Sequence, residues 1–244
     1  MNRDVEPPPP PPEAGLLIPP ATWKPIEAVP VFLIAQVAGA FLYQFAQAFP
    51  TCGGRFALSG LAGEVAMALT VILWVRFVDR APLAALGRPR EPVRDVGVGA
   101  AVGVAMVFLG GLILFVIDAL VTSLVGHRVA QPEQVDACVR GGWLVATGPV
   151  VILAAPLGEE PFFRGFLFRG LRTRFGLWPS AIMSGVAFGL VHFQGPEFLL
   201  IIPSLAVVGL AFALLFERRQ SLLATIAAHA AFNAAGFIMI SWGR

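Results

Sequence analysis

Residues 156–165 read PLGEEPFFRG, and this short stretch decides how the whole chain is interpreted. It places Glu159, Glu160 and Arg164 inside an apolar segment that extends from residue 143 to residue 168. An ionisable side chain in a lipid-spanning helix costs free energy, so it normally faces a partner or a water-filled cavity. The stretch therefore predicts a functional site within the membrane.

The composition supports a membrane environment for the rest of the chain as well. Of the 244 residues, 57% are apolar and only 13% are charged. A soluble domain of this length needs far more polar surface. No basic cluster is interleaved with aromatic residues, so we expect no nucleic-acid partner. We predict a multi-pass protein of the cell membrane, surrounded by the lipid bilayer.

The distribution of apolar residues predicts an all-α, polytopic bundle of about seven transmembrane helices. A span needs about 20 apolar residues, and backbone groups in lipid must satisfy one another, which favours helices. The segments are 28–49, 57–78, 96–125, 143–168, 177–193, 198–216 and 222–242. The third segment is long and rich in glycine, so a break within it would give an eighth span.

Arginine-rich loops set the expected orientation and the division of the chain. Arginines concentrate in residues 76–94, 169–174 and 218–219, which seven spans place on one side. The positive-inside rule makes this side, and the N-terminus, cytoplasmic. The proline tract at residues 7–12 predicts a disordered cytoplasmic tail over residues 1–24. Transmembrane helices follow in residues 25–142 and 143–242, and the second group carries the expected site.

The two cysteines lie in loops that this topology places outside. Cys52 and Cys138 are the only cysteines of the chain. Outward compartments are often oxidising, so a disulfide between them is one interpretation. The sequence does not show that the two loops meet, and two free thiols remain the alternative.

Three patterns with a spacing of four residues carry the expected chemistry. They are Glu159-Glu160-x-x-x-Arg164, Phe188-x-x-x-His192 and His229-x-x-x-Asn233. This spacing places the end members of each pattern on one face of a helix. Glu160 and Arg164 can form an ion pair, while Glu159 points about 100° away and is free for chemistry.

The stretches GEEPFFRGFLFRGL, AIMSGVAFGLVHF and TIAAHAAFNA resemble the three motifs of the CPBP intramembrane protease family. This family includes CAAX prenyl endopeptidases and bacteriocin-processing or self-immunity proteins. The resemblance covers roughly residues 143–240, and both glutamates, the arginine, both histidines and the asparagine are present. It implies an endopeptidase whose substrate is a peptide or a membrane protein.

Peptide hydrolysis gives each of these residues an expected role. Glu159 and His192 would activate a water molecule, and His229 and Asn233 would stabilise the oxyanion. Glu160 and Arg164 would hold the helix and the local charge. The favoured mechanism requires no cofactor, although Glu159, His192 and His229 could instead bind a divalent metal such as zinc.

Two other classes of protein remain as alternatives. A non-proteolytic immunity or scaffold protein could keep the same fold, and a proton-coupled transporter could also use buried glutamate and histidine. The intact motifs favour the enzyme over the scaffold, and the lack of an internal repeat disfavours the transporter. Glu64 and Asp118 belong to no motif and are interpreted as residues at helix contacts or cavity walls. The oligomeric state is left open.

Overall fold

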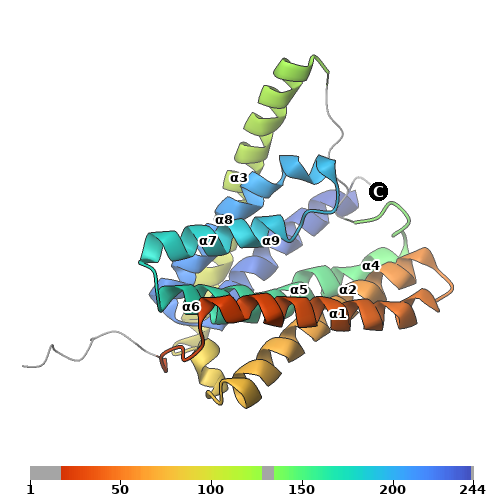
Figure 1. Ribbon diagram of the computed structural model, residues 1–244. Helices are drawn as coiled ribbons and strands as arrows, with labels where there is room; N and C mark the ends of the chain where they lie inside the picture. The colour runs from red at the N-terminus through yellow and green to blue at the C-terminus, as the bar shows by residue number, and fades with distance from the viewer. Residues whose placement is uncertain (1–17, 128–134, 243–244) are drawn as a thin grey trace, which may run out of the picture.

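The computed structural model describes residues 18–127 and 135–242, which form a bundle of helices without a strand. The N-terminal half contains α1 (Ala28–Gln47), α2 (Cys52–Leu73) and α3 (Pro92–Val125). The next transmembrane segment contains α4 (Gly142–Pro149), α5 (Ala155–Glu160) and α6 (Arg169–Arg172). It is followed by α7 (Leu177–Leu190), α8 (Ile202–Arg219) and α9 (Leu222–Trp242) (Figure 1). The predicted all-α class is confirmed.

The predicted spans correspond to helices of the bundle. Among the described residues, five helical segments are long and apolar enough to cross a membrane. They are Pro25–Gln47, Cys52–Val78, Pro92–Val125, Gly142–Arg172 and Leu222–Trp242. The other two predicted spans correspond to α7, a shorter apolar helix, and to α8, which ends in charged residues. Helix α3 is continuous over 34 residues, so the break considered for an eighth span is absent there.

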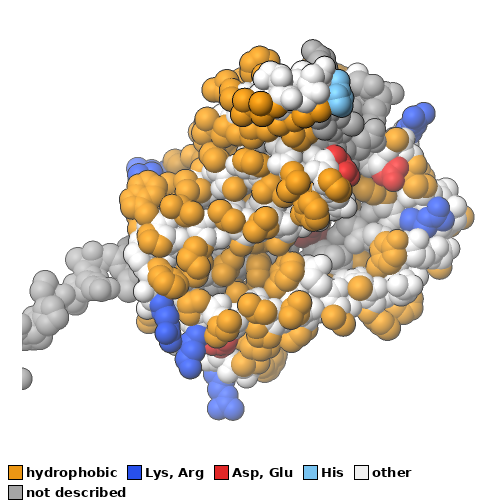
Figure 2. Space-filling model, turned by 45° about the horizontal axis from the view of Figure 1, so that its top comes forward, with side chains coloured by type: hydrophobic (Ala, Val, Ile, Leu, Met, Phe, Trp, Pro, Cys, Tyr) orange, Lys and Arg blue, Asp and Glu red, His pale blue; other side chains and the backbone are white. Residues whose placement is uncertain are grey.

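The outer surface of the bundle is apolar, as a lipid-facing surface requires. Side chains such as Val37, Phe108, Phe115 and Leu124 are largely exposed. Figure 2 shows hydrophobic side chains over most of one face, with Lys and Arg side chains near its edges. The chain is therefore a multi-pass membrane protein.

Small residues let α7 and α8 approach closely. A Cβ atom added to Gly185 would lie 2.6 Å from the Ala206 carbonyl oxygen, and one on Gly189 would lie 2.8 Å from that of Ile202. A larger residue at either position would separate the two backbones. The glycines of α7 thus permit the close contact between the two helices.

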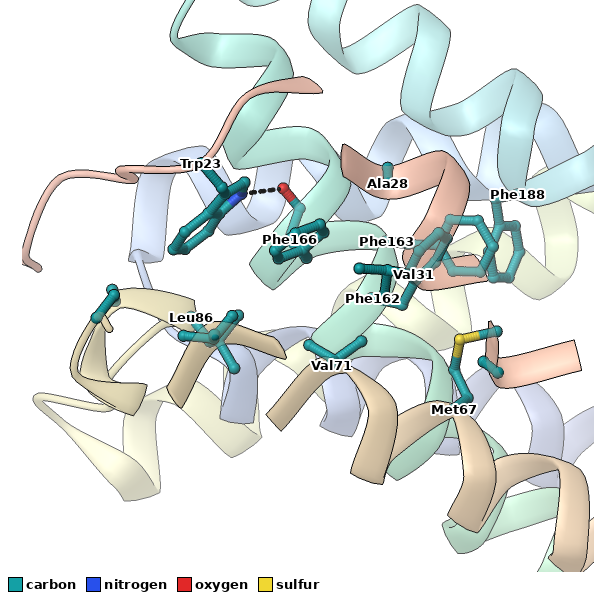
Figure 3. Packing of buried hydrophobic residues seen from close by; sticks show 14 of the residues in the cluster. Trp23, Ala28, Val31, Met67, Val71, Leu86, Phe162, Phe163, Phe166 and Phe188 are labelled. Atoms are coloured by element: carbon teal, nitrogen blue, oxygen red, sulfur yellow. Dashed lines mark hydrogen bonds between the residues drawn. The ribbon is translucent and has the colours of Figure 1, made fainter. Parts of the chain in front are cut away.

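The segment before α1 packs against the bundle instead of extending the tail. Ile18 and Trp23 are buried, so the ordered chain begins before residue 24, the predicted end of the tail. The Trp23 indole nitrogen donates to the Phe166 carbonyl oxygen at 2.8 Å, and the two rings stack with centroids 5.0 Å apart (Figure 3). Residues 1–17, with the proline tract, lie outside the described residues. Trp23 thereby fixes the N-terminal segment to the helix that carries the glutamates.

A disulfide between Cys52, the first residue of α2, and Cys138, before α4, joins the two loops that lead into these helices. The bond links positions 86 residues apart in the sequence. It resolves the question that the sequence left open about these two cysteines, and it places both loops at the same end of the bundle.

We expect the disulfide to stabilise the protein. Replacing Cys52 and Cys138 by Ser should lower the free energy of unfolding by about 2–4 kcal/mol, because closing so long a loop restricts the unfolded chain. Unfolding in detergent, monitored by circular dichroism, measures this loss. Wild-type protein that reacts with a thiol reagent before reduction would contradict the assignment.

Asp79, just after the second transmembrane segment, makes stability depend on pH. Burial, and then the neighbouring Glu27 carboxyl, raise the pKa of Asp79 to about 7, from an ordinary value of 3.8. The folded state thus binds a proton that the unfolded state has lost, and stability should fall as the pH rises from about 4 to about 7. We expect Asp79→Asn to raise the melting temperature at pH 8 and to change it little at pH 4. An equal change in melting temperature at pH 8 and at pH 4 would contradict a shifted pKa of Asp79.

Candidate active site

The helix that carries the two glutamates is irregular on both sides of them. Pro149, Pro156 and Pro161 interrupt it, and a proline removes a backbone N–H donor from the helix. π-Helical turns occupy Val150–Ala154 and Pro161–Phe168. Such wide turns are rare and frequently occur at functional sites. Glu159 and Glu160 therefore lie at the end of a short α-helical piece between two wide turns.

Glu160 lies at the centre of a buried polar cluster that also contains Arg164 and His229. Its Oε1 atom accepts from Arg164 Nη1 at 2.8 Å and lies 2.9 Å from His229 Nδ1. Glu160 and Arg164 are fully buried, and His229 is 3% exposed. The Arg164 Nη2 atom also donates to the Gly209 carbonyl oxygen at 3.2 Å. The ion pair expected from the sequence forms, and it connects the glutamate helix to α8 and α9.

Aromatic rings enclose the charged end of Arg164. Its Cζ atom lies 4.5 Å from the Phe188 ring centroid, 5.3 Å from that of Phe212 and 5.6 Å from that of Phe163. The negative face of an aromatic ring attracts a cation, and the effect is strongest away from water. The rings therefore compensate part of the cost of removing the guanidinium from water.

Glu159 points into a different environment from its neighbour. It lines a cavity of about 610 Å³ together with His192 and Glu64. Polar side chains from α1, from α2 and from the segment after α7 complete this wall: Gln36, Tyr43, Gln44, Ser59 and Gln194. Figure 2 shows a hollow in this face with an acidic side chain at depth. The two adjacent glutamates are thus divided between a polar cavity and a sealed cluster.

The orientation of His192 suits it to hold a water molecule. Its Nδ1 atom lies 2.8 Å from the Phe188 carbonyl oxygen, which can only accept a hydrogen bond. In the neutral ring Nδ1 therefore carries the proton, and Nε2 is left as an acceptor. Glu159 and His192 then offer two acceptors to water in the same cavity.

The structure does not bring His229 and Asn233 to one point in the way that their spacing suggested. His229 is held by Glu160, whereas Asn233 Nδ2 donates to the Val151 carbonyl oxygen at 2.8 Å. Asn233 also lines another cavity, of about 690 Å³, with Asp118. The second amide hydrogen of Asn233 is left for an oxyanion. Because Nδ1 of His229 faces the Glu160 carboxylate, its Nε2 atom can donate to an oxyanion only when both ring nitrogens carry a proton.

A compact zinc site from Glu159, His192 and His229 does not assemble in this arrangement. In the described part of the chain, one group of three metal-ligating side chains has all its ligand atoms within 4.8 Å, namely Cys52, Asp136 and Cys138. Both sulfur atoms of that group are used in the disulfide. Glu159, His192 and His229 thus do not fit a three-ligand metal centre.

Two features of the site were not predicted from the sequence. The first is the pairing of Glu160 with His229, because helical spacing shows which residues share a face but not which helix that face meets. The second is the position of Phe188, whose ring centroid lies 5.0 Å from the ring of His192 and 5.5 Å from that of His229. Phe188 therefore connects the cavity to the buried cluster.

Comparison with known proteins finds a family that is similar to the part of the chain that carries the site. Residues 141–235 match the family described as type II CAAX prenyl endopeptidase Rce1-like. This match confirms the resemblance to the CPBP membrane proteases. All six predicted site residues lie within the matched segment.

Two bacterial proteins are similar over longer stretches. The "Uncharacterized 24.3 kDa protein" of Escherichia coli is 28% identical over 170 residues, 68% of this chain and 73% of that protein. The "Uncharacterized protein YyaK" of Bacillus subtilis (strain 168) is 28% identical over 131 residues, 52% of this chain. That match spans only 40% of YyaK. No solved structure matches the chain.

The buried cluster makes a clear prediction for stability. Arg164→Ala should lower the free energy of unfolding by about 3–5 kcal/mol, because it leaves the Glu160 carboxylate buried without its cation. The matched control is Arg172→Ala, which removes a partly exposed pair with Glu217 at 2.9 Å and should cost at most about 1 kcal/mol. Thermal unfolding in detergent compares the two variants. Equal losses of unfolding free energy in the two variants would contradict the structural role assigned to the buried Arg164–Glu160 pair.

Proposed function

We propose that the protein is an intramembrane endopeptidase that hydrolyses peptide bonds with water activated by Glu159 and His192. The observation that carries the proposal is that these two residues, from separate parts of the chain, line one polar cavity inside an apolar bundle. The match to a CAAX endopeptidase family supports peptidase activity independently.

The proposed reaction begins with a water molecule between Glu159 and His192. The Glu159 carboxylate accepts a proton from the water, and His192 Nε2 orients it by accepting a second hydrogen bond. The resulting hydroxide attacks the peptide carbonyl carbon, and the negative charge passes to the carbonyl oxygen. Asn233, and His229 in the form that carries a proton on both ring nitrogens, are the groups proposed to donate to that oxygen after substrate binding has adjusted the site. The proton on Glu159 then passes to the leaving amine.

Glu160 and Arg164 are proposed to fix this arrangement without touching the substrate. Their ion pair determines the rotation of the helix, and hence the direction in which Glu159 points. The hydrogen bond that Glu160 accepts from His229 Nδ1 fixes the orientation of that ring. Because Glu160 and Arg164 already hold Glu159 and His229 in place, these groups lose little entropy when the transition state forms.

A neighbouring apolar cavity supports a substrate that approaches from the lipid. It has a volume of about 950 Å³ and is lined by residues of α1, α7 and the helix of Glu159. Phe32, Phe163 and Val191 line both this cavity and the polar one. We propose that the substrate is a membrane-associated peptide, either lipidated, as the family description suggests, or a hydrophobic segment of a membrane protein.

The test is the cleavage of fluorogenic peptides by the purified protein in lipid vesicles. Glu159→Gln and His192→Ala should each lower kcat by about 100-fold or more, because each removes one partner of the water molecule. Glu197→Gln removes an exposed carboxylate outside the cavity and should leave the rate unchanged. A chelator should have no effect in the proposed mechanism.

Two results would contradict the proposal in different ways. Equal cleavage by wild type and Glu159→Gln would refute the catalytic assignment and favour a non-proteolytic scaffold of the same fold. Activity that the chelator abolishes and zinc restores would replace the metal-free mechanism with a metal-dependent one.

A further inference from the structure

Glu64 lies outside the segment that matches the protease family, yet it reaches the proposed active site. It belongs to α2, whereas the match begins at residue 141. The structure places its side chain in the wall of the cavity that Glu159 and His192 also line. The residue that appeared isolated in the sequence is therefore a second carboxyl group at the site.

The contact between α2 and α5 explains how Glu64 comes so near to Glu159. A Cβ atom added to Gly158 would lie 2.8 Å from the Glu64 carbonyl oxygen and 2.9 Å from its Cα atom. The added atom would also meet the Glu64 carboxylate. The absence of a side chain at Gly158 thus lets the carboxylate of Glu64 lie directly against the backbone next to Glu159.

Glu159 has an oxygen atom that could accept a hydrogen bond from a protonated Glu64 carboxyl group. Its Oε2 atom is buried and has no hydrogen-bond partner among the described residues. Buried carboxylate oxygens nearly always accept a hydrogen bond, so this atom requires a donor. Two ionised carboxylates facing one cavity would repel each other, whereas a pair that holds one proton gains a hydrogen bond.

The other charged and titratable groups near Glu159 are consistent with a shared proton. Tyr43 from α1 and His192, which follows α7, line the cavity with the two glutamates. Arg164, on the same helix as Glu159, attracts its carboxylate from the buried side.

We propose that Glu64 is the positioning residue of Glu159, and that the two carboxyl groups share one proton, which Glu64 holds and donates toward Glu159 Oε2. The catalytic meaning of this pair rests on the proposed function. When Glu159 accepts a proton from water, the pair holds two protons. One of them passes to the leaving amine as the C–N bond breaks, which returns the pair to one.

Infrared difference spectroscopy at pH 7 tests the proton without any substrate. The spectrum of wild type minus Glu64→Gln should show the carbonyl stretch of one protonated carboxyl group. Wild type minus Glu159→Gln should show an ionised carboxylate, as should wild type minus the control Glu197→Gln. An ionised signal for Glu64, or a protonated signal for Glu159, would overturn the proposal.

Kinetics test whether the pair matters for catalysis. Glu64→Gln should lower kcat by about 100-fold, with KM within about twofold, because the amide keeps a donor but cannot exchange a proton. Glu64→Asp keeps the carboxyl group and should retain more than a tenth of the wild-type kcat. Unchanged kcat in Glu64→Gln, or an equal loss in Glu64→Asp, would overturn the positioning role. If wild type cleaves no peptide, the proposed function fails, while the infrared result still decides whether Glu64 holds the proton.

Discussion

The structure depends on the burial of one arginine. Arg164 is completely removed from solvent in a chain that is 57% apolar, and its charge is balanced by Glu160 at 2.8 Å and by three aromatic rings. A buried charge is tolerated only when its partners are placed accurately. The helices that supply Glu160, Phe188, Phe212 and His229 must therefore meet at this residue, and their meeting fixes the geometry of the cavity beside it.

Two glutamates at adjacent positions of one helix can lie in different environments. Neighbouring residues of a helix point about 100° apart, so Glu160 enters the sealed cluster while Glu159 faces the cavity. The irregular turns around them, together with the hydrogen bond from Trp23 to Phe166, hold this part of the helix in place. The chemistry proposed for Glu159 thus depends on the structural role of its neighbour.

Much of this arrangement could be predicted from the sequence, because hydrophobic length and helical spacing are local properties. They predicted the helices and the Glu160–Arg164 pair. They could not predict that His229 pairs with Glu160, that Asn233 turns to the Val151 carbonyl, or that the cavity lined by Glu64 is the one that Glu159 faces. Each of these depends on how two helices are rotated relative to each other, and that rotation follows from packing around Arg164.

The central claim is that water reaches Glu159 while the adjoining cluster is sealed. Both native cysteines are in the disulfide, so a cysteine introduced into the bundle is the sole free thiol among the described residues. We expect Glu159→Cys and His192→Cys to react rapidly with a small, charged, water-soluble thiol reagent in the folded protein. Ala228→Cys, at a fully buried position on α9, should react only after unfolding. Equal protection of all three thiols, or equal reactivity, would contradict the division between cavity and cluster.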